Sequence, residues 1–151
     1  MASMFFKYYA QTYRIDRTPG GRRRGTILNL TTGLFEEDTE YLGEVLGATT
    51  TSHIKGLSEE RFVQESEIER NHFLSGDGPI FALYETVNGL YALARKEERR
   101  IGPQELALIR SLYQRTFKMW EDEAARRAAG EPPSFEVTSM AVAPEEPSSE
   151  Q

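Results

Sequence analysis

The sequence predicts an α+β fold, in which an N-terminal β-hairpin packs on a mainly helical domain of about four helices. Two observations predict this class. Aromatic and β-branched residues gather in residues 1–34, and apolar residues recur every three or four positions in much of 35–130. From residue 131 the chain is rich in proline, glutamate and serine, which predicts a disordered acidic tail over residues 131–151. We therefore expect a single domain over residues 1–130, followed by this tail.

Two strand-like segments on either side of a turn predict the hairpin. Residues 4–15 are rich in tyrosine and phenylalanine, and residues 26–32 alternate apolar side chains between two faces. Between them, Pro19-Gly20-Gly21 supplies the fixed and the permissive backbone angles of a turn. We expect a hairpin with a long basic tip. Because two strands alone are marginal in water, they need the helices or another strand to pack against.

Helix signals follow the hairpin in order. An acidic segment over 36–46 predicts a short first helix, and Ser58 is expected to cap a charged helix over 59–74. Wide apolar stripes predict helices over 80–100 and 103–129. The short link between these last two helices predicts that they form an antiparallel helical hairpin.

The apolar stripe of the last helix is wider than one partner helix can cover. Tyr113, Phe117 and Trp120 belong to this stripe. Aromatic residues at helical spacing are typical of a packed core, and an aromatic excess on an outer face is typical of a protein interface. We take these three residues as the candidate protein interface, for a partner protein or for a second copy of the chain in a dimer.

Positive charge is concentrated at the N-terminus of an acidic protein. The chain carries 18 Lys+Arg against 24 Asp+Glu, a net charge of −6, yet residues 1–34 contain six basic residues and a single aspartate. An arginine side chain is a planar fork that matches phosphate or carboxylate, and nearby aromatic rings can stack on bases. The tip is therefore a candidate contact for nucleic acid or an acidic partner, and the alternative is a solvated loop. The candidate residues are Arg14, Arg17, Arg22, Arg23 and Arg24.

Three short motifs stand in a recognisable order in this region: Tyr13-Arg14-Ile15-Asp16, Gly21-Arg22-Arg23-Arg24 and Thr26-Ile27-Leu28-Asn29-Leu30. Together they resemble the N-terminal hairpin of insertion-sequence DDE transposases, where a similar pattern precedes a short acidic helix. The resemblance covers about 35 of the 151 residues and implies a hairpin that contacts nucleic acid. The glycine that the pattern has after Leu30 is displaced to Gly33, and the family's catalytic RNase H-like domain has no counterpart in this chain.

Other chemistry finds little support in the sequence. The absence of cysteine excludes disulfides, a thiol nucleophile and iron–sulfur clusters. No nucleophile elbow or phosphate-binding loop is present. Glu65, Glu69 and His72 share one helix face with the spacing of a metal-ligand row, but a solvated charged face is the favoured interpretation. We expect no catalytic residue, no metal site and no cofactor.

These observations favour a non-catalytic interaction protein, an inhibitor or adaptor that acts through protein–protein contacts of its acidic helical surface. The alternative is a nucleic-acid-associated module that contacts phosphates through the arginine-rich tip. We expect a cytoplasmic protein without a membrane partner, because no apolar run reaches the roughly 18 residues of a membrane span and the N-terminus lacks a signal-peptide layout.

Overall fold

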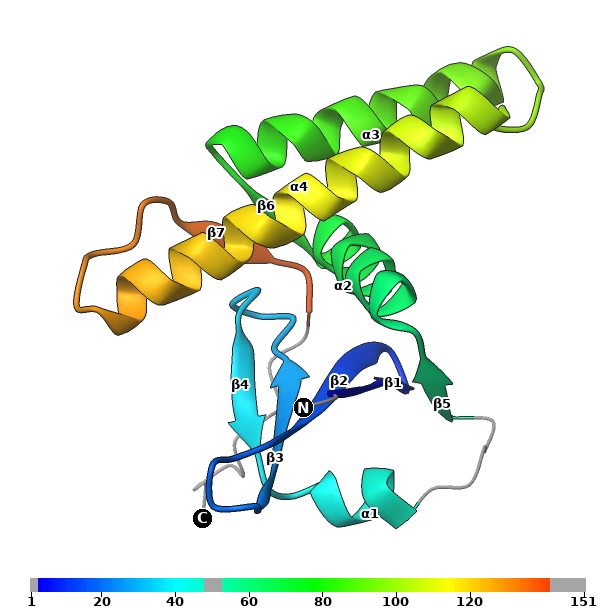
Figure 1. Ribbon diagram of the computed structural model, residues 1–151. Coiled ribbons are helices and arrows are strands. Elements are labelled where there is room, and N and C mark those ends of the chain that lie inside the picture. Colours follow the sequence, from blue (N-terminus) through cyan, green and yellow to red (C-terminus); the bar gives the residue numbers. More distant parts are fainter. Residues whose placement is uncertain (1–2, 48–52, 142–151) are drawn as a thin grey trace, which may run out of the picture.

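The computed structural model describes residues 3–47 and 53–141 and confirms the α+β class (Figure 1). Its N-terminal part is a five-stranded antiparallel sheet with the strand order β4-β3-β2-β1-β5. The predicted hairpin is the central pair, β2 and β3, joined by a turn over residues 18–22. The five strands are β1 (Met4–Tyr8), β2 (Gln11–Arg17), β3 (Arg23–Leu28), β4 (Phe35–Asp38) and β5 (Ile54–Leu57).

Four helices lie within the described residues, and the last two form the predicted antiparallel hairpin (Figure 1). Ser58 caps α2 as expected, because its hydroxyl oxygen accepts a hydrogen bond from the backbone N–H of Arg61 at 3.1 Å. None of these helices is both long and apolar enough to cross a membrane. The helices are α1 (Leu42–Gly47), α2 (Glu59–Phe73), α3 (Pro79–Lys96) and α4 (Pro103–Ala128).

The prediction of one strand over 4–15 is wrong, because the chain reverses at Tyr9 and Ala10. Tyr9 adopts a left-handed φ of 55°, which is uncommon for a bulky residue, and its ring stacks on His53 with centroids 4.9 Å apart. The two halves become β1 and β2, which pair with each other. A turn without glycine or proline gives no sequence signal.

The prediction of a helix over 36–46 is wrong in its first half. Phe35–Asp38 forms β4, which pairs with β3, and α1 begins only at Leu42. The cause is the buried side chain of Asp38, which accepts hydrogen bonds from the Tyr13 hydroxyl at 2.7 Å and from the backbone N–H of Tyr41 at 3.0 Å. These contacts fix an aspartate turn where the acidic run resembles a helix start.

The apolar core has two parts. One fills the space between the helices, and the other lies between the sheet and α1. The helical part consists of Leu74, Ile80, Phe81, Tyr84, Val87, Ile109, Tyr113 and Trp120. The sheet part consists of Tyr8, Tyr13, Ile15, Val45 and Ile54. Helix α2 lies on the other face of the sheet and also packs against α4, so it joins the two halves of the molecule (Figure 1).

Part of the predicted disordered tail is ordered. A short strand, β7 (Val137–Ser139), pairs with β6 (Leu74–Gly76), and the Ser139 hydroxyl donates to the Leu30 carbonyl oxygen at 2.6 Å. Phe135 packs against Trp120, with ring centroids 5.2 Å apart. The apolar side chains of Phe135 and Val137 pack against the helical core, which explains why this segment folds onto the domain. The prediction for 142–151 lies outside the described residues.

Glu123 of α4 holds the start of this segment. Its Oε2 accepts hydrogen bonds from the Ser134 backbone N–H at 2.8 Å and from Arg127 Nε at 2.7 Å. Burial alone would raise the pKa of Glu123, but these donors outweigh burial and lower the pKa to about 2. The carboxylate therefore stabilises the fold above the ordinary pKa of 4.5, and this stability is lost as the pH falls toward 2.

Replacing Glu123 with glutamine is expected to lower the free energy of unfolding by about 2 kcal/mol at pH 7, because hydrogen bonds to a buried charge are lost. Urea unfolding of the wild type and the variant at pH 7 and pH 3 measures the loss. The gap between the two proteins should narrow at pH 3, where the unfolded wild type is already protonated. A gap that is equal at both pH values would contradict this role of the carboxylate.

Candidate functional site

One face of the sheet is only partly covered by α2. At the covered end, Thr12 of β2 is fully buried, and its hydroxyl lies 2.8 Å from that of Ser66 on α2. Side chains alternate along a strand, so Arg14 and Asp16 point to the same face two and four residues further on. Both are partly exposed, because α2 does not extend over this end of β2 and β3.

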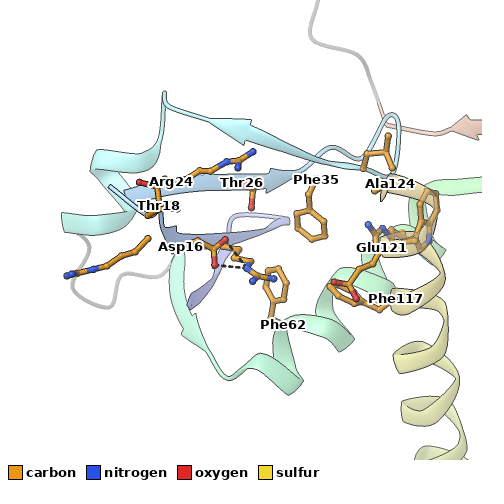
Figure 2. Close-up of a pocket in the computed structure, with 15 residues that line it drawn as sticks. Asp16, Thr18, Arg24, Thr26, Phe35, Phe62, Phe117, Glu121 and Ala124 are labelled. Carbon is orange, nitrogen blue, oxygen red and sulfur yellow. Dashed lines mark hydrogen bonds and ion pairs between the residues drawn. The ribbon is translucent and has the colours of Figure 1, made fainter. Parts of the chain in front are cut away.

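A pocket of about 490 Å³ lies over the uncovered end, within the range typical of sites for small ligands (Figure 2). Figure 2 shows Asp16 and Thr26 of the sheet on one side, with Glu121 and Ala124 of α4 across from them. We call this space the arginine pocket. Its lining residues are Arg14, Asp16, Arg17, Thr18, Pro19, Arg24, Thr26, Leu34, Phe35, Phe62, Arg70, Phe117, Trp120, Glu121 and Ala124.

Three phenylalanines from different elements form the apolar side of the pocket (Figure 2). Phe35 comes from β4, Phe62 from α2 and Phe117 from α4. Their ring centroids are 5.5 Å apart for Phe35 and Phe62, 6.0 Å for Phe62 and Phe117, and 6.2 Å for Phe35 and Phe117. They contact one another in tilted and edge-to-face geometry, so they form a preorganised aromatic surface.

A buried arginine lies against these rings. Only 2 % of Arg70 is exposed, and its guanidinium lies 4.6 Å from the ring centroid of Trp120. Arg70 Nη1 donates to Glu67 Oε2 at 2.7 Å, and Arg70 Nε donates to the Gly33 carbonyl oxygen at 2.9 Å. The counter-charge and the carbonyl compensate the cost of burying the guanidinium.

The ion pair extends into the helical core through Tyr84. The Tyr84 hydroxyl donates to Glu67 Oε1 at 2.8 Å and accepts from Trp120 Nε1 at 2.9 Å. Burial and the neighbouring Glu67 carboxylate raise the pKa of Tyr84, which keeps the hydroxyl protonated as a donor. Glu67, Arg70, Tyr84 and Trp120 thus form one hydrogen-bonded network behind the pocket.

One nitrogen of Arg70 is left over from this network. Nη2 makes no hydrogen bond within residues 3–47 and 53–141. No fully buried side-chain nitrogen or oxygen in the same residues lacks a partner, so Nη2 is not fully enclosed. Arg70 is one of the residues that line the arginine pocket, and 2 % of it is exposed.

The structure divides the five arginines that the sequence singled out. Arg14, Arg17 and Arg24 line the pocket, whereas Arg22 and Arg23 do not. Arg14 is held by Asp16 at 2.9 Å, and the exposed Arg24 lies 3.6 Å from Glu37. Arg17, Arg22 and Arg23 are exposed and have no ion pair among the described residues. The free positive charge therefore lies at the hairpin end of the pocket.

The three aromatic residues of the candidate interface also differ from one another in how deeply they are buried. Tyr113 and Trp120 are 4 % and 1 % exposed and belong to the helical core, so in this fold they present no surface to a partner. They are buried because both α2 and α3 pack against α4. Phe117 is half-buried and lines the arginine pocket. Of the three, it presents the most surface to a ligand, whereas the buried Trp120 only borders the pocket.

The acidic row on α2 has a local partner. Lys7 of β1 binds Glu69 at 2.9 Å and Glu65 at 3.4 Å. Where the structure describes the chain, it brings together no group of three histidine, aspartate or glutamate residues with the arrangement of a metal site. The row therefore fastens α2 to the sheet through β1.

Fold and site together define a small α+β protein with an arginine-rimmed aromatic pocket. Comparison of the chain with protein-family models, with curated proteins and with solved structures finds no match in any of the three. The resemblance of the hairpin to that of DDE transposases therefore stays a prediction. Function has to be inferred from the chemistry of the pocket.

Proposed function

We propose that this chain is a non-catalytic nucleic-acid-binding module that holds a single strand across the arginine pocket. The observation that supports this most is the meeting of Arg14, Arg17 and Arg24 with an aromatic surface on one open sheet face. Arginine forks bind phosphate oxygens, and aromatic rings stack on bases. A single strand exposes its phosphates and its bases at the same time.

The charge of the whole protein favours a local contact. The net charge of −6 opposes long-range attraction of nucleic acid, so binding depends on the hairpin end of the pocket. A duplex would offer its phosphates to the arginines but would keep its bases stacked away from Phe35 and Phe117. The recessed aromatic surface therefore favours a single strand over a duplex.

The double variant Arg17→Ala/Arg24→Ala tests the phosphate contacts. Fluorescence anisotropy with a labelled 12-residue oligothymidylate at about 50 and 200 mM salt measures affinity and its salt dependence. We expect wild-type affinity to fall as salt rises. The variant should bind at least tenfold more weakly at low salt, and its slope of log K against log salt should be smaller by about 1.

Arg95→Ala/Arg115→Ala is the matched control, because it removes the same charge from exposed arginines of α3 and α4 outside the pocket. It should leave the slope nearly unchanged. Arg22→Ala/Arg23→Ala removes two arginines that do not line the pocket. It should lower the affinity for the strand less than Arg17→Ala/Arg24→Ala does. Equal losses in all three variants would show a non-specific charge effect and contradict the proposal.

A protein-binding module is the second candidate function. Large apolar side chains are exposed near the outer end of the α3–α4 hairpin, away from the sheet (Figure 1). They are Tyr91, Leu93, Leu106 and Leu108. Such exposure on a helical surface favours a partner protein or a second copy of the chain. If the protein binds no strand at either salt concentration, the nucleic-acid proposal is wrong and this candidate replaces it.

A further inference from the structure

We infer that the arginine pocket receives one unstacked base of the bound strand, with an acceptor atom of that base directed at Arg70. This inference rests on the proposed function and adds a base-recognition site to it. It starts from the spare donor of Arg70 and from the opposite charges at the two ends of the pocket.

The spare donor is a built feature. Arg70 is almost fully buried and lines the pocket, its Nε and Nη1 are occupied, and Nη2 has no hydrogen-bond partner among the described residues. The guanidinium cannot swing away, because Glu67 and the Gly33 carbonyl hold two of its nitrogens and three aromatic rings lie within 5.6 Å of its central carbon. A fixed, desolvated donor selects ligands that bring an acceptor to it.

The aromatic surface suits a planar ring. Phe35, Phe62 and Phe117 all line the same space as Arg70, so a base that enters meets ring faces or edges and the donor together (Figure 2). Every base carries a carbonyl oxygen or a ring nitrogen that accepts a hydrogen bond, so a base held in the pocket can meet a donor of Arg70.

The charges orient the nucleotide. Arg17 and Arg24 lie at the hairpin end, whereas Glu121 of α4 lies at the opposite end and has no ion pair among the described residues. A phosphate is attracted to the first end and repelled from the second. The phosphate therefore lies over the hairpin and the base points toward Phe117 and Ala124.

Trp120 supplies an optical probe, because it is the only tryptophan of the chain and it lines the pocket. Titration with oligothymidylate is expected to quench its fluorescence. An abasic strand of the same length, which keeps the sugar-phosphate backbone, should bind about tenfold more weakly without this quenching, because one stacked base is lost.

Ala124→Phe tests the pocket without removing any contact of Arg70. Ala124 is exposed at the edge of the pocket, so the larger side chain fills the space that the base would occupy. We expect this variant to lose the preference for oligothymidylate over the abasic strand but to keep salt-dependent binding of both. Ala125→Phe is the matched control on the neighbouring exposed residue outside the pocket and should retain the preference.

The outcomes separate this inference from the proposed function. If oligothymidylate and the abasic strand bind equally and with the same salt dependence, the arginines bind phosphate but the base pocket is wrong. If neither strand binds, the proposed function itself fails. Displacement of the strand by an acidic phenylalanine-containing peptide that binds more tightly would identify the pocket as a protein-binding site and overturn the inference.

Discussion

Replacing Glu67 with glutamine is expected to lower the free energy of unfolding by about 4 kcal/mol, because the buried Arg70 then lacks its counter-charge. The carboxylate serves two donors: Oε2 accepts from Arg70 Nη1 at 2.7 Å, and Oε1 accepts from the Tyr84 hydroxyl at 2.8 Å. Glutamine has a single side-chain acceptor oxygen, so its amide nitrogen would face one of these donors. Urea unfolding followed by circular dichroism measures the loss, which corresponds to a Tm lower by roughly 10 °C.

Glu60→Gln is the control for this change. Glu60 is an exposed residue in the first turn of α2, without an ion pair among the residues that the structure describes. Its replacement should change the free energy of unfolding by less than about 1 kcal/mol. A similarly small loss for Glu67→Gln would mean that Arg70 does not depend on this carboxylate, and it would contradict the buried network.

Gly33→Ala is expected to destabilise the protein by about 3 kcal/mol, for two reasons. Gly33 has a φ of 82°, where any side chain costs about 1 kcal/mol. A Cβ at this position would also lie 2.6 Å from Trp120 Cη2 and 2.8 Å from Leu74 Cδ1, which is overpacking of the helical core. Thermal or urea unfolding of the variant measures the combined loss of stability from the backbone and from overpacking.

Gly21→Ala separates the two causes. Gly21 has the same φ of 82°, but nothing lies within 4 Å of a Cβ built there. This control should lose only the backbone cost of about 1 kcal/mol. If the free energy of unfolding falls equally in both variants, the close approach of Gly33 to Trp120 does not contribute to the loss of stability. Because the Gly33 carbonyl also binds Arg70, its variant should weaken strand binding as well.

The helices were predictable because their signals are local. Ser58 caps α2, proline begins α3 and α4, and apolar spacing marks their buried faces. The sheet was less predictable, because its pairing joins distant segments. Strand β5 lies between the predicted helices over 36–46 and 59–74, where the sequence analysis expected no strand, and it forms by pairing with β1. A turn at Tyr9 has no composition signal at all.

The exposed charges of the site were predictable, but its buried arginine, Arg70, was not. Arg14, Arg17 and Arg24 stand out because basic residues cluster in the sequence. Arg70 does not, since it sits in a charged helix whose buried face is itself polar: Ser66, Glu67 and Arg70 are buried there, whereas the apolar Ile68 is 43 % exposed. Apolar periodicity cannot identify a helix face that is buried through ion pairing.

The contact between Ser139 and Leu30 has a consequence for how the protein is made. This hydrogen bond joins β7 to the N-terminal part of the chain across 109 residues of sequence, and the strand pair β6–β7 joins β7 to the segment after α2. During synthesis the sheet and helices α1 to α4 leave the ribosome before β7 does. The contacts of β7 therefore form only after residues 135–139 have left the ribosome, and until then Phe81 and Trp120 lack the ring of Phe135 that packs against them.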